Sequence, residues 1–326
     1  MSDIAQRRLT RKTILIATTA AAVAVGVTLT ALPASADSGS TRGSTSTRGD
    51  AAFFAASLNG ANEVPVPGGP AAGDRDGAAL EFLKVEGSTV SFAVKWRGTD
   101  RPTALHIHQG GRGVNGEVKI DFTDQLGKDK DKGKGKGHSL TGSVEVRDAA
   151  LLDALKAGPT GFYANLHTAE FPGGAVRGQF HQVADAFDFG HALRSVQAPV
   201  LRGRQIYACK KGTDGKFSFQ QRDVRAVLAG DIAHSFAEPD SGTPEWIAPD
   251  RSAVTGAVIS KTPNGAANIP ELNLRAQQSG KKRGLLAHTG EILRLNTVGG
   301  VAPAGSCTEG SLAAVSYRAD YVFVPR

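Results

Sequence analysis

The chain has 326 residues, enough for two domains of ordinary size, and its 40 glycines, single methionine and 6% aromatic content favour a turn-rich β protein over a helical bundle. The formal net charge is +7. An N-terminal leader contributes four basic residues and one acidic residue, and a Lys/Gly-rich loop contributes five lysines and two aspartates. The rest is close to neutral, which argues against a nucleic-acid-binding surface, because such a surface needs basic residues spread over one face.

The first 36 residues have the pattern of a signal peptide. Basic residues at 7–12 precede an apolar run at 14–32, and a small-residue cleavage box follows at 34–36. We therefore predict cleavage after Ala36, a secreted or extracellular protein, and no stable membrane span in the mature chain. An uncleaved membrane anchor is the alternative, because the apolar run is long enough to span a bilayer.

The chain that follows predicts an all-β (mainly β) fold. Residues 37–51 are rich in Ser, Thr and Gly and predict a flexible tether. Residues 148–156 give the one good helical pattern, and the Lys/Gly insert at 127–138 predicts a disordered loop. Strands are predicted around His106 and at 53–58, 78–84, 89–96, 117–122, 139–146, 162–168 and 175–183. Many short strands with one small helix are typical of a β-sandwich or barrel.

Three histidines stand in strand patterns that place them on common faces. His106 and His108 are two residues apart, so on a strand both imidazoles point the same way. Tyr163, Asn165 and His167 share one face of a second strand by the same alternation. Three imidazoles from two strands match the ligand set of a single Zn or Cu ion with an open position.

The candidate metal site has further predicted members. His181 on the closing strand is a possible fourth ligand. Tyr163 and Asn165 are candidates for hydrogen bonds that orient the ligating imidazoles. In the competing interpretation, the histidines bind backbone groups in tight turns and fix the loops. The sequence alone leaves both interpretations open.

Four motifs run in order through residues 53–182. They are Leu58-x-Gly60-x-Asn62-Glu63-Val64-Pro65, then His106-Ile107-His108 with Gly110, Gly113, Asn115 and Gly116, then Tyr163-x-Asn165-x-His167-Thr168, and Pro172-Gly173-Gly174 with Arg177, Gly178 and Gln179. On these motifs, this part of the chain resembles the chordin (CHRD) domain family, and we assign it residues 52–183. The chain departs from the family pattern at Ala175, where Glu is usual, and at Glu117, where Pro is usual.

The resemblance carries a functional implication without a reaction. In chordin-like proteins the domain is an extracellular module of a growth-factor antagonist, and bacterial members are secreted proteins with no assigned reaction. It therefore implies an extracellular binding module whose partner is an unknown extracellular protein or envelope component.

A second β-rich domain is predicted at 196–326, after a linker at 184–195. Its motifs are Gln205-Ile206-Tyr207-x-Cys209, Ile269-Pro270, Arg294-Leu295-Asn296-Thr297-x-Gly299-Gly300 and Tyr317-x-Ala319-Asp320-Tyr321-x-Phe323. On these motifs it resembles an uncharacterised family of secreted proteins, in which Trp commonly follows Ile-Pro, where this chain has Glu271. Two cysteines in an exported protein predict a disulfide between Cys209 and Cys307, which the resemblance also implies, with two buried thiols as the alternative.

No complete catalytic constellation is present in the sequence. There is no Gly-x-Ser-x-Gly elbow, P-loop or dinucleotide fingerprint. His234 and Trp246 with Asp250 are candidates for a pocket lining, although a buried Trp beside a satisfied His is the commoner arrangement. The favoured function is thus a non-enzymatic extracellular binding module, and the alternative is a metal-binding protein or metalloenzyme that uses His106, His108 and His167.

Overall fold

The computed structural model describes residues 51–126 and 138–326 of the chain. The predicted signal peptide, the tether up to residue 50 and the Lys/Gly insert at 127–137 lie outside the described residues. Within the described part of the chain, no helix combines the length and apolar character needed to cross a membrane.

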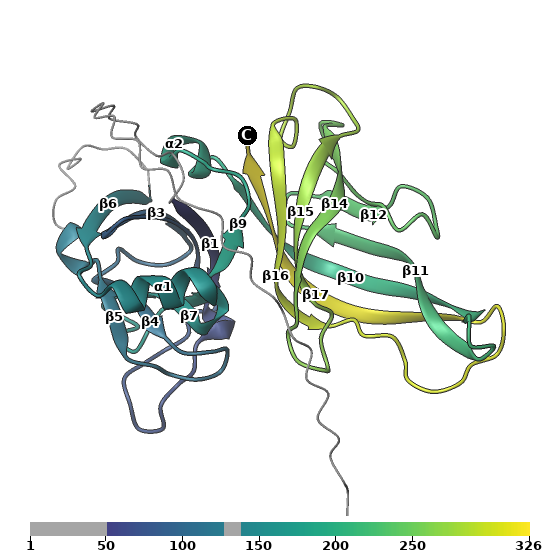
Figure 1. Ribbon diagram of the computed structural model, residues 1–326, viewed down its shortest axis with the longest axis horizontal. Coiled ribbons are helices and arrows are strands. Elements are labelled where there is room, and N and C mark those ends of the chain that lie inside the picture. The colour runs from purple at the N-terminus through teal and green to yellow at the C-terminus, as the bar shows by residue number, and fades with distance from the viewer. Residues whose placement is uncertain (1–50, 127–137) are drawn as a thin grey trace, which may run out of the picture. The chain divides into compact units, whose positions relative to one another are not determined.

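The first half forms a curled antiparallel sheet of nine strands (Figure 1). Its strands are β1 (Ala52–Asn59), β2 (Ala78–Glu86), β3 (Thr89–Arg97), β4 (Ala104–Gln109), β5 (Val118–Asp121), β6 (Ser139–Glu145), β7 (Phe162–His167), β8 (Val176–Gln179) and β9 (His181–Val183). The spatial order is β5-β4-β7-β8-β1-β2-β3-β6, and β9 pairs with β1. The closing strand predicted at 175–183 is two strands, β8 and β9, separated by Phe180, whose side chain is buried in the core. β8 pairs with both β7 and β1, and β9 pairs with β1 in the same register.

The apolar core lies on the concave face of this sheet and is covered by helix α1 (Ala149–Ala157) (Figure 1). Asp148 caps α1, since its carboxylate accepts a hydrogen bond from the Leu151 amide. Leu152 and Leu155 on the buried face of α1 join the sheet core. The helix predicted at 148–156 is confirmed.

One carboxyl lies inside this core. Glu81 alternates along β2 with Ala79 and Leu83, both core residues, and its side chain is fully buried. Neither of its carboxyl oxygens has a hydrogen-bond partner among the described residues. Burial raises the pKa of Glu81 to about 8, so the carboxyl is mainly protonated at neutral pH.

The second half forms a closed barrel of eight antiparallel strands that follow one another in sequence order. The strands are β10 (Val196–Lys211), β11 (Phe217–Leu228), β12 (Ile232–Phe236), β13 (Pro244–Ile247), β14 (Ala253–Thr262), β15 (Glu271–Gln278), β16 (Thr289–Gly299) and β17 (Leu312–Pro325). The short helix α2 (Phe189–Ala192) precedes the barrel within the predicted linker. The Cys209–Cys307 disulfide is present and ties β10 to the loop between β16 and β17. The predicted fold class, two β-rich parts with one disulfide, is confirmed.

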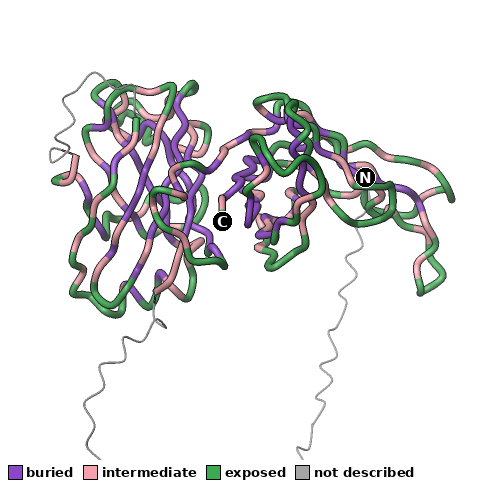
Figure 2. The backbone as a smooth tube through the Cα atoms, turned by 90° about the horizontal axis from the view of Figure 1, so that it is seen from above, coloured by how far each residue is buried: buried purple, intermediate pink, exposed green. Residues whose placement is uncertain are grey.

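The sheet and the barrel belong to one unit and share a third apolar cluster. It combines side chains of β1, β2 and β9, such as Phe82, with side chains of β16 and β17, such as Leu293. Buried polar contacts accompany it: Asp320 of β17 accepts hydrogen bonds from Ser57 and Asn59 of β1, each at 3.0 Å. Figure 2 shows buried residues following the strands and exposed residues following the connecting loops.

Candidate metal centre

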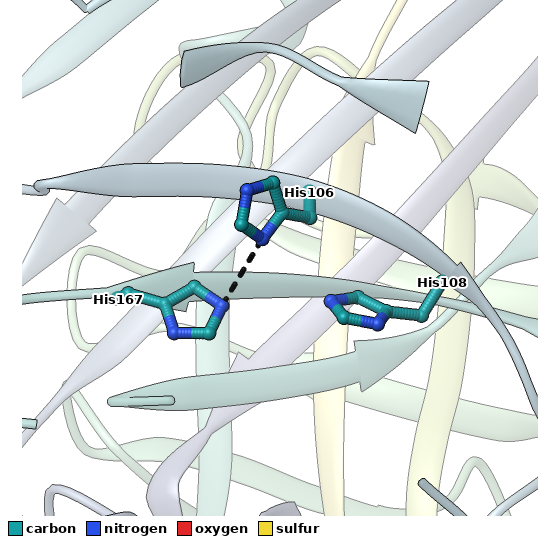
Figure 3. Close-up of side chains that lie close together, drawn as sticks. All are labelled: His106, His108 and His167. Atoms are coloured by element: carbon teal, nitrogen blue, oxygen red, sulfur yellow. Dashed lines mark hydrogen bonds between the residues drawn. The ribbon is translucent and has the colours of Figure 1, made fainter. Parts of the chain in front are cut away.

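The pairing of β4 with β7 brings the three predicted histidines together. In this antiparallel register His106 lies opposite Asn165, and Ala104 lies opposite His167. Leu105 of β4 points into the core, so His106 and His108 occupy the other face of the sheet. One ring nitrogen of each histidine lies within 4.8 Å of the others, and Figure 3 shows these nitrogens facing the space between the rings.

The outer nitrogens of two of these rings fix their tautomers. His108 Nδ1 is 2.9 Å from the carbonyl oxygen of Gly116, and His167 Nδ1 is 3.0 Å from that of Pro172. A carbonyl oxygen only accepts, so both Nδ1 atoms carry hydrogen and donate. In the neutral rings each Nε2 atom therefore carries no hydrogen, and its lone pair faces the space between the rings.

The outer nitrogen of the third ring, His106, contacts side chains instead of a backbone carbonyl. His106 Nε2 is 3.3 Å from the Thr123 hydroxyl and 3.4 Å from the Asp121 carboxylate. Its other nitrogen, Nδ1, is 3.3 Å from His167 Nε2 (Figure 3). In the hydrogen-bonded arrangement His106 Nδ1 carries the hydrogen and donates to His167 Nε2. When the hydrogen is on Nε2 and is donated to the outer edge, as in a ligating His, Nδ1 becomes the third inward lone pair.

The three imidazoles are neutral near pH 7. Burial, together with the neighbouring His167 and His108, lowers the pKa of His106 to about 4, although Asp121 opposes the shift. Burial also lowers the pKa of His108 and of His167. Neutral imidazole is the form that binds a metal ion, so protons do not block these nitrogens at neutral pH.

His108 Nε2 is the atom that hydrogen bonds leave unexplained. It is buried and has no hydrogen-bond partner among the described residues. A chain of hydrogen bonds from Thr123 through His106 and His167 to Pro172 satisfies those two rings without any added atom. Within the described structure, that chain supplies no donor for His108 Nε2, and a buried acceptor without a donor is costly.

The comparisons with known proteins cover this site. The model of the CHRD domain family matches residues 54–180, and the model described as protein of unknown function (DUF3455) matches residues 228–324. The chain carries a CHRD domain and a DUF3455 domain. No curated protein and no solved structure matches the chain.

Tyr163 and Arg177 of the CHRD domain hold His108 and its loop in place. The Tyr163 ring stacks on His108, with centroids 4.8 Å apart and planes within 5°. The Arg177 guanidinium lies 3.5 Å from the centroid of the same Tyr163 ring. Arg177 also donates to the carbonyl oxygens of Gly111 and Val114, so it fixes the loop that carries the acceptor of His108. The predicted orienting role of Tyr163 thus has a stacking geometry instead of a hydrogen bond to an imidazole.

Asn165, which lies opposite His106 on β7, and Glu63 both lie close to Gly174. The Asn165 Oδ1 atom is buried and has no partner among the described residues, and no described hydrogen bond joins Asn165 to a histidine. A Cβ at Gly174 would lie 2.7 Å from Glu63 Oε1 and 2.8 Å from Asn165 Oδ1, and Gly174 has φ +119°, so this position requires glycine. Burial raises the pKa of Glu63 to about 7, although Arg177 and Asn165 oppose the shift.

The structure does not bring the fourth predicted ligand, His181, to the other three histidines. His181 lies on β9 opposite Ala55 of β1, past the end of the pairing between β7 and β8. Its Nε2 is 3.1 Å from the Glu271 carboxylate of the DUF3455 domain, and both side chains are buried. His181 therefore contacts the barrel, and among the described residues the histidine group has three members.

In the DUF3455 domain, His234 and Trp246 lie together but Asp250 does not join them. The His234 ring stacks on Trp246 with centroids 4.4 Å apart, and both of its nitrogens have partners, the Glu245 carbonyl and the Tyr321 hydroxyl. Asp250 instead accepts from the backbone amides of Ser252 and Leu285. His234 is therefore a satisfied core histidine.

Several groups that complete the histidine site were not found from the sequence. They act through backbone carbonyls, as at Gly116 and Pro172, or lie outside the quoted motifs, as Asp121 and Thr123 do. The glycines of the quoted motifs indicate that backbone segments pack closely at this site. They do not indicate which backbone carbonyl accepts a hydrogen bond from which histidine.

Proposed function

We propose that the CHRD domain binds one divalent transition-metal ion, Zn²⁺ or Cu²⁺, through His106 Nδ1, His108 Nε2 and His167 Nε2. The observation that carries this proposal is the buried His108 Nε2, which lacks a donor and faces two other imidazole nitrogens. The metal-binding function is the alternative that the sequence left open. For a binding module, the described residues offer no feature that identifies a partner.

The spacing of the nitrogens supports the proposal. Zn–N bonds of about 2.0–2.1 Å put two nitrogens on one tetrahedral ion about 3.3–3.4 Å apart. His106 Nδ1 and His167 Nε2 are 3.3 Å apart. His106 and His167 are half-buried and His108 is only just buried, so an ion can reach the site and keep a position for water or another ligand.

The donor set supports a borderline metal over Mg²⁺ or Ca²⁺. Those two ions prefer oxygen ligands, whereas imidazole suits Zn²⁺ and Cu²⁺. Outer hydrogen bonds to two carbonyls, and a carboxylate 3.4 Å from His106 Nε2, match the partners that usually orient ligating imidazoles.

The test is elemental analysis of the full chain, purified without a polyhistidine tag, followed by calorimetric titration of the chelator-treated protein with Zn²⁺ and with Cu²⁺. We expect about one ion per chain. His108→Phe keeps a ring to stack on Tyr163 but removes the ligand nitrogen, and it should abolish stoichiometric binding. The matched control, His288→Ala, removes an exposed histidine outside the group and should bind as the parent does.

Failure of the parent protein to retain or bind either ion would overturn the proposal, and so would unchanged binding by His108→Phe. In the Cu²⁺-loaded parent, electron paramagnetic resonance should show hyperfine coupling to nitrogen. Absence of that coupling in a stoichiometric complex would place the ion elsewhere.

We also propose that the protein is exported and that its mature chain begins at Asp37. The Cys209–Cys307 disulfide supports this, because such bonds persist mainly in oxidising compartments. Intact-mass measurement of the protein recovered outside the cytoplasm tests it. A mass that includes residues 1–36 would refute cleavage at this position.

A further inference from the structure

The DUF3455 barrel encloses a cavity of about 470 Å³. Small eight-stranded barrels either fill their interior with side chains or hold one small ligand. The volume lies within the range of ordinary ligand pockets. Apolar and aromatic side chains form much of the wall: Tyr207, Phe236, Trp246, Leu272, Leu274 and Tyr321.

The cavity reaches the loops at one end of the barrel. In a barrel whose strands follow one another, every second connection lies at the same end. The loops 237–243, 263–270 and 300–311 are such connections, and each contributes lining residues, such as Gly242, Ala266 and Val301. The disulfide holds the third of these loops against β10 through Cys307.

The cavity wall carries unused hydrogen-bond donors. Trp246 Nε1 and Gln205 Nε2 are buried and have no partner among the described residues. The Gln205 oxygen is occupied, since it accepts from Gln221 at 2.6 Å. The Tyr207 hydroxyl donates to the Gly300 carbonyl at 2.5 Å. The cavity wall therefore has hydrogen-bond donors that lack an acceptor.

The wall also carries an uncompensated cation. Arg294 donates through Nε and Nη2 to the Pro270 carbonyl, and within the described residues it makes no salt bridge. Lys261 is a second lining cation. The lining carboxylate, Asp240, is already paired with Lys210 and Arg222, at 2.5 and 2.6 Å. A partly buried guanidinium without a carboxylate favours an anionic partner.

We propose that this barrel binds a small amphipathic organic anion, with a carboxylate at Arg294 and an aromatic or short aliphatic body against Trp246 and Leu274. The carboxylate supplies the acceptor and the negative charge that the wall lacks, and a planar guanidinium pairs with it in bidentate geometry. The apolar walls exclude a fully polar anion as the best ligand, because its body would lose water without compensation. The site is separate from the histidine group, so its ligand and the metal ion are tested independently.

The experiment uses the full chain with Trp96→Phe, which leaves Trp246 as the single tryptophan. Phenylacetate and octanoate are titrated against Trp246 fluorescence and by calorimetry, and phenylacetamide, a neutral analogue of the first, is the matched probe. We expect saturable 1:1 binding of an anion at least about tenfold tighter than the amide, because the charge-assisted contact is lost in the amide.

Arg294→Met should remove this preference for the anion, whereas Arg318→Met, which removes an exposed arginine of β17, should keep it. Equal affinity for phenylacetate and phenylacetamide in the parent would overturn the proposal, as would no saturable binding of any probe. Anion binding unaffected by Arg294→Met would overturn it as well. If Arg294→Met does not fold, the comparison of acid with amide in the parent decides alone.

Discussion

The buried carboxyl of Glu81 predicts that the CHRD domain loses stability as the pH rises. Burial raises the pKa of the Glu81 carboxyl in the native state from its ordinary value of 4.5 to about 8. Above pH 4.5 the unfolded chain releases this proton while the native chain keeps it. Since the native state then binds more protons, the free energy of unfolding falls with increasing pH until the native carboxyl itself ionises.

The size of the effect follows from the two pKa values. Each pH unit between them costs about 1.4 kcal/mol. For a shift from 4.5 to about 8, linkage gives a cost of about 1 kcal/mol at pH 5, about 3 kcal/mol at pH 7 and 4–5 kcal/mol at pH 9. Glu81→Gln removes the titration, so the stability of the variant relative to the parent should rise by about 2–3 kcal/mol from pH 5 to pH 7.

The assay is urea unfolding at several pH values, with the disulfide intact, followed by Trp96 fluorescence in a Trp246→Phe background. Taking the difference between parent and Glu81→Gln cancels the titration of every other group. Glu170→Gln measures the effect of removing an exposed carboxyl and is subtracted. A difference that stays flat or falls between pH 5 and pH 8 would show that Glu81 is ionised in the native core and would refute the reasoning.

Three further predictions concern the metal site, the disulfide and the contact between the domains. Asp121→Asn removes the charge beside an imidazole and should lower Zn²⁺ or Cu²⁺ affinity about tenfold in calorimetric titration; unchanged affinity contradicts it. Replacing Cys209 and Cys307 by Ser should lower the free energy of unfolding in denaturant by up to about 4–5 kcal/mol, since it removes a cross-link across 98 residues; no change refutes the link's role. Glu271→Ala removes a buried carboxylate that pairs with the partly exposed Arg112 and accepts from the buried Asn296 amide, and it should lower the free energy of unfolding by about 2–3 kcal/mol. Arg112→Ala should add little in that background, and full additivity would contradict the pairing.

The histidine group could be predicted from strand alternation, but the pairing register of the two strands that carry it could not. Alternation placed His106 and His108 together on one face of the first strand. It placed Tyr163, Asn165 and His167 together on one face of the second strand. Whether the two faces coincide depends on which residues pair, and the observed pairing of His106 with Asn165 brings His167 diagonally beside His106. Side-chain period says nothing about this choice, because a slip of one residue would have turned His167 away.

The structure places His181 apart from the other three histidines for a related reason. Alternation from Gln179 to His181 holds, because β8 and β9 pair with β1 in one register, with Arg177 opposite Asn59 and His181 opposite Ala55. His181 instead lies past the last residue pair of β7 and β8, which is Tyr163 with Gln179. Alternation fixes the face on which a side chain lies, but not how far along the neighbouring strands it lies. The closure of the barrel was beyond the sequence for the same reason, since it depends on the pairing of β10 with β17, two strands at opposite ends of that half.

Glu271 shows how a single position of β15 serves both halves of the chain. Its carboxylate accepts from Arg112 at 2.7 Å and lies 3.1 Å from His181 Nε2, so it contacts two side chains from the first half of the chain. The next residue, Leu272, points the opposite way along the strand and lines the barrel cavity. The Trp usual in the related family would supply no carboxylate for Arg112, whose loop also carries the carbonyl acceptor of His108. The carboxylate of Glu271 therefore joins the loop beside the histidine group to a strand of the barrel.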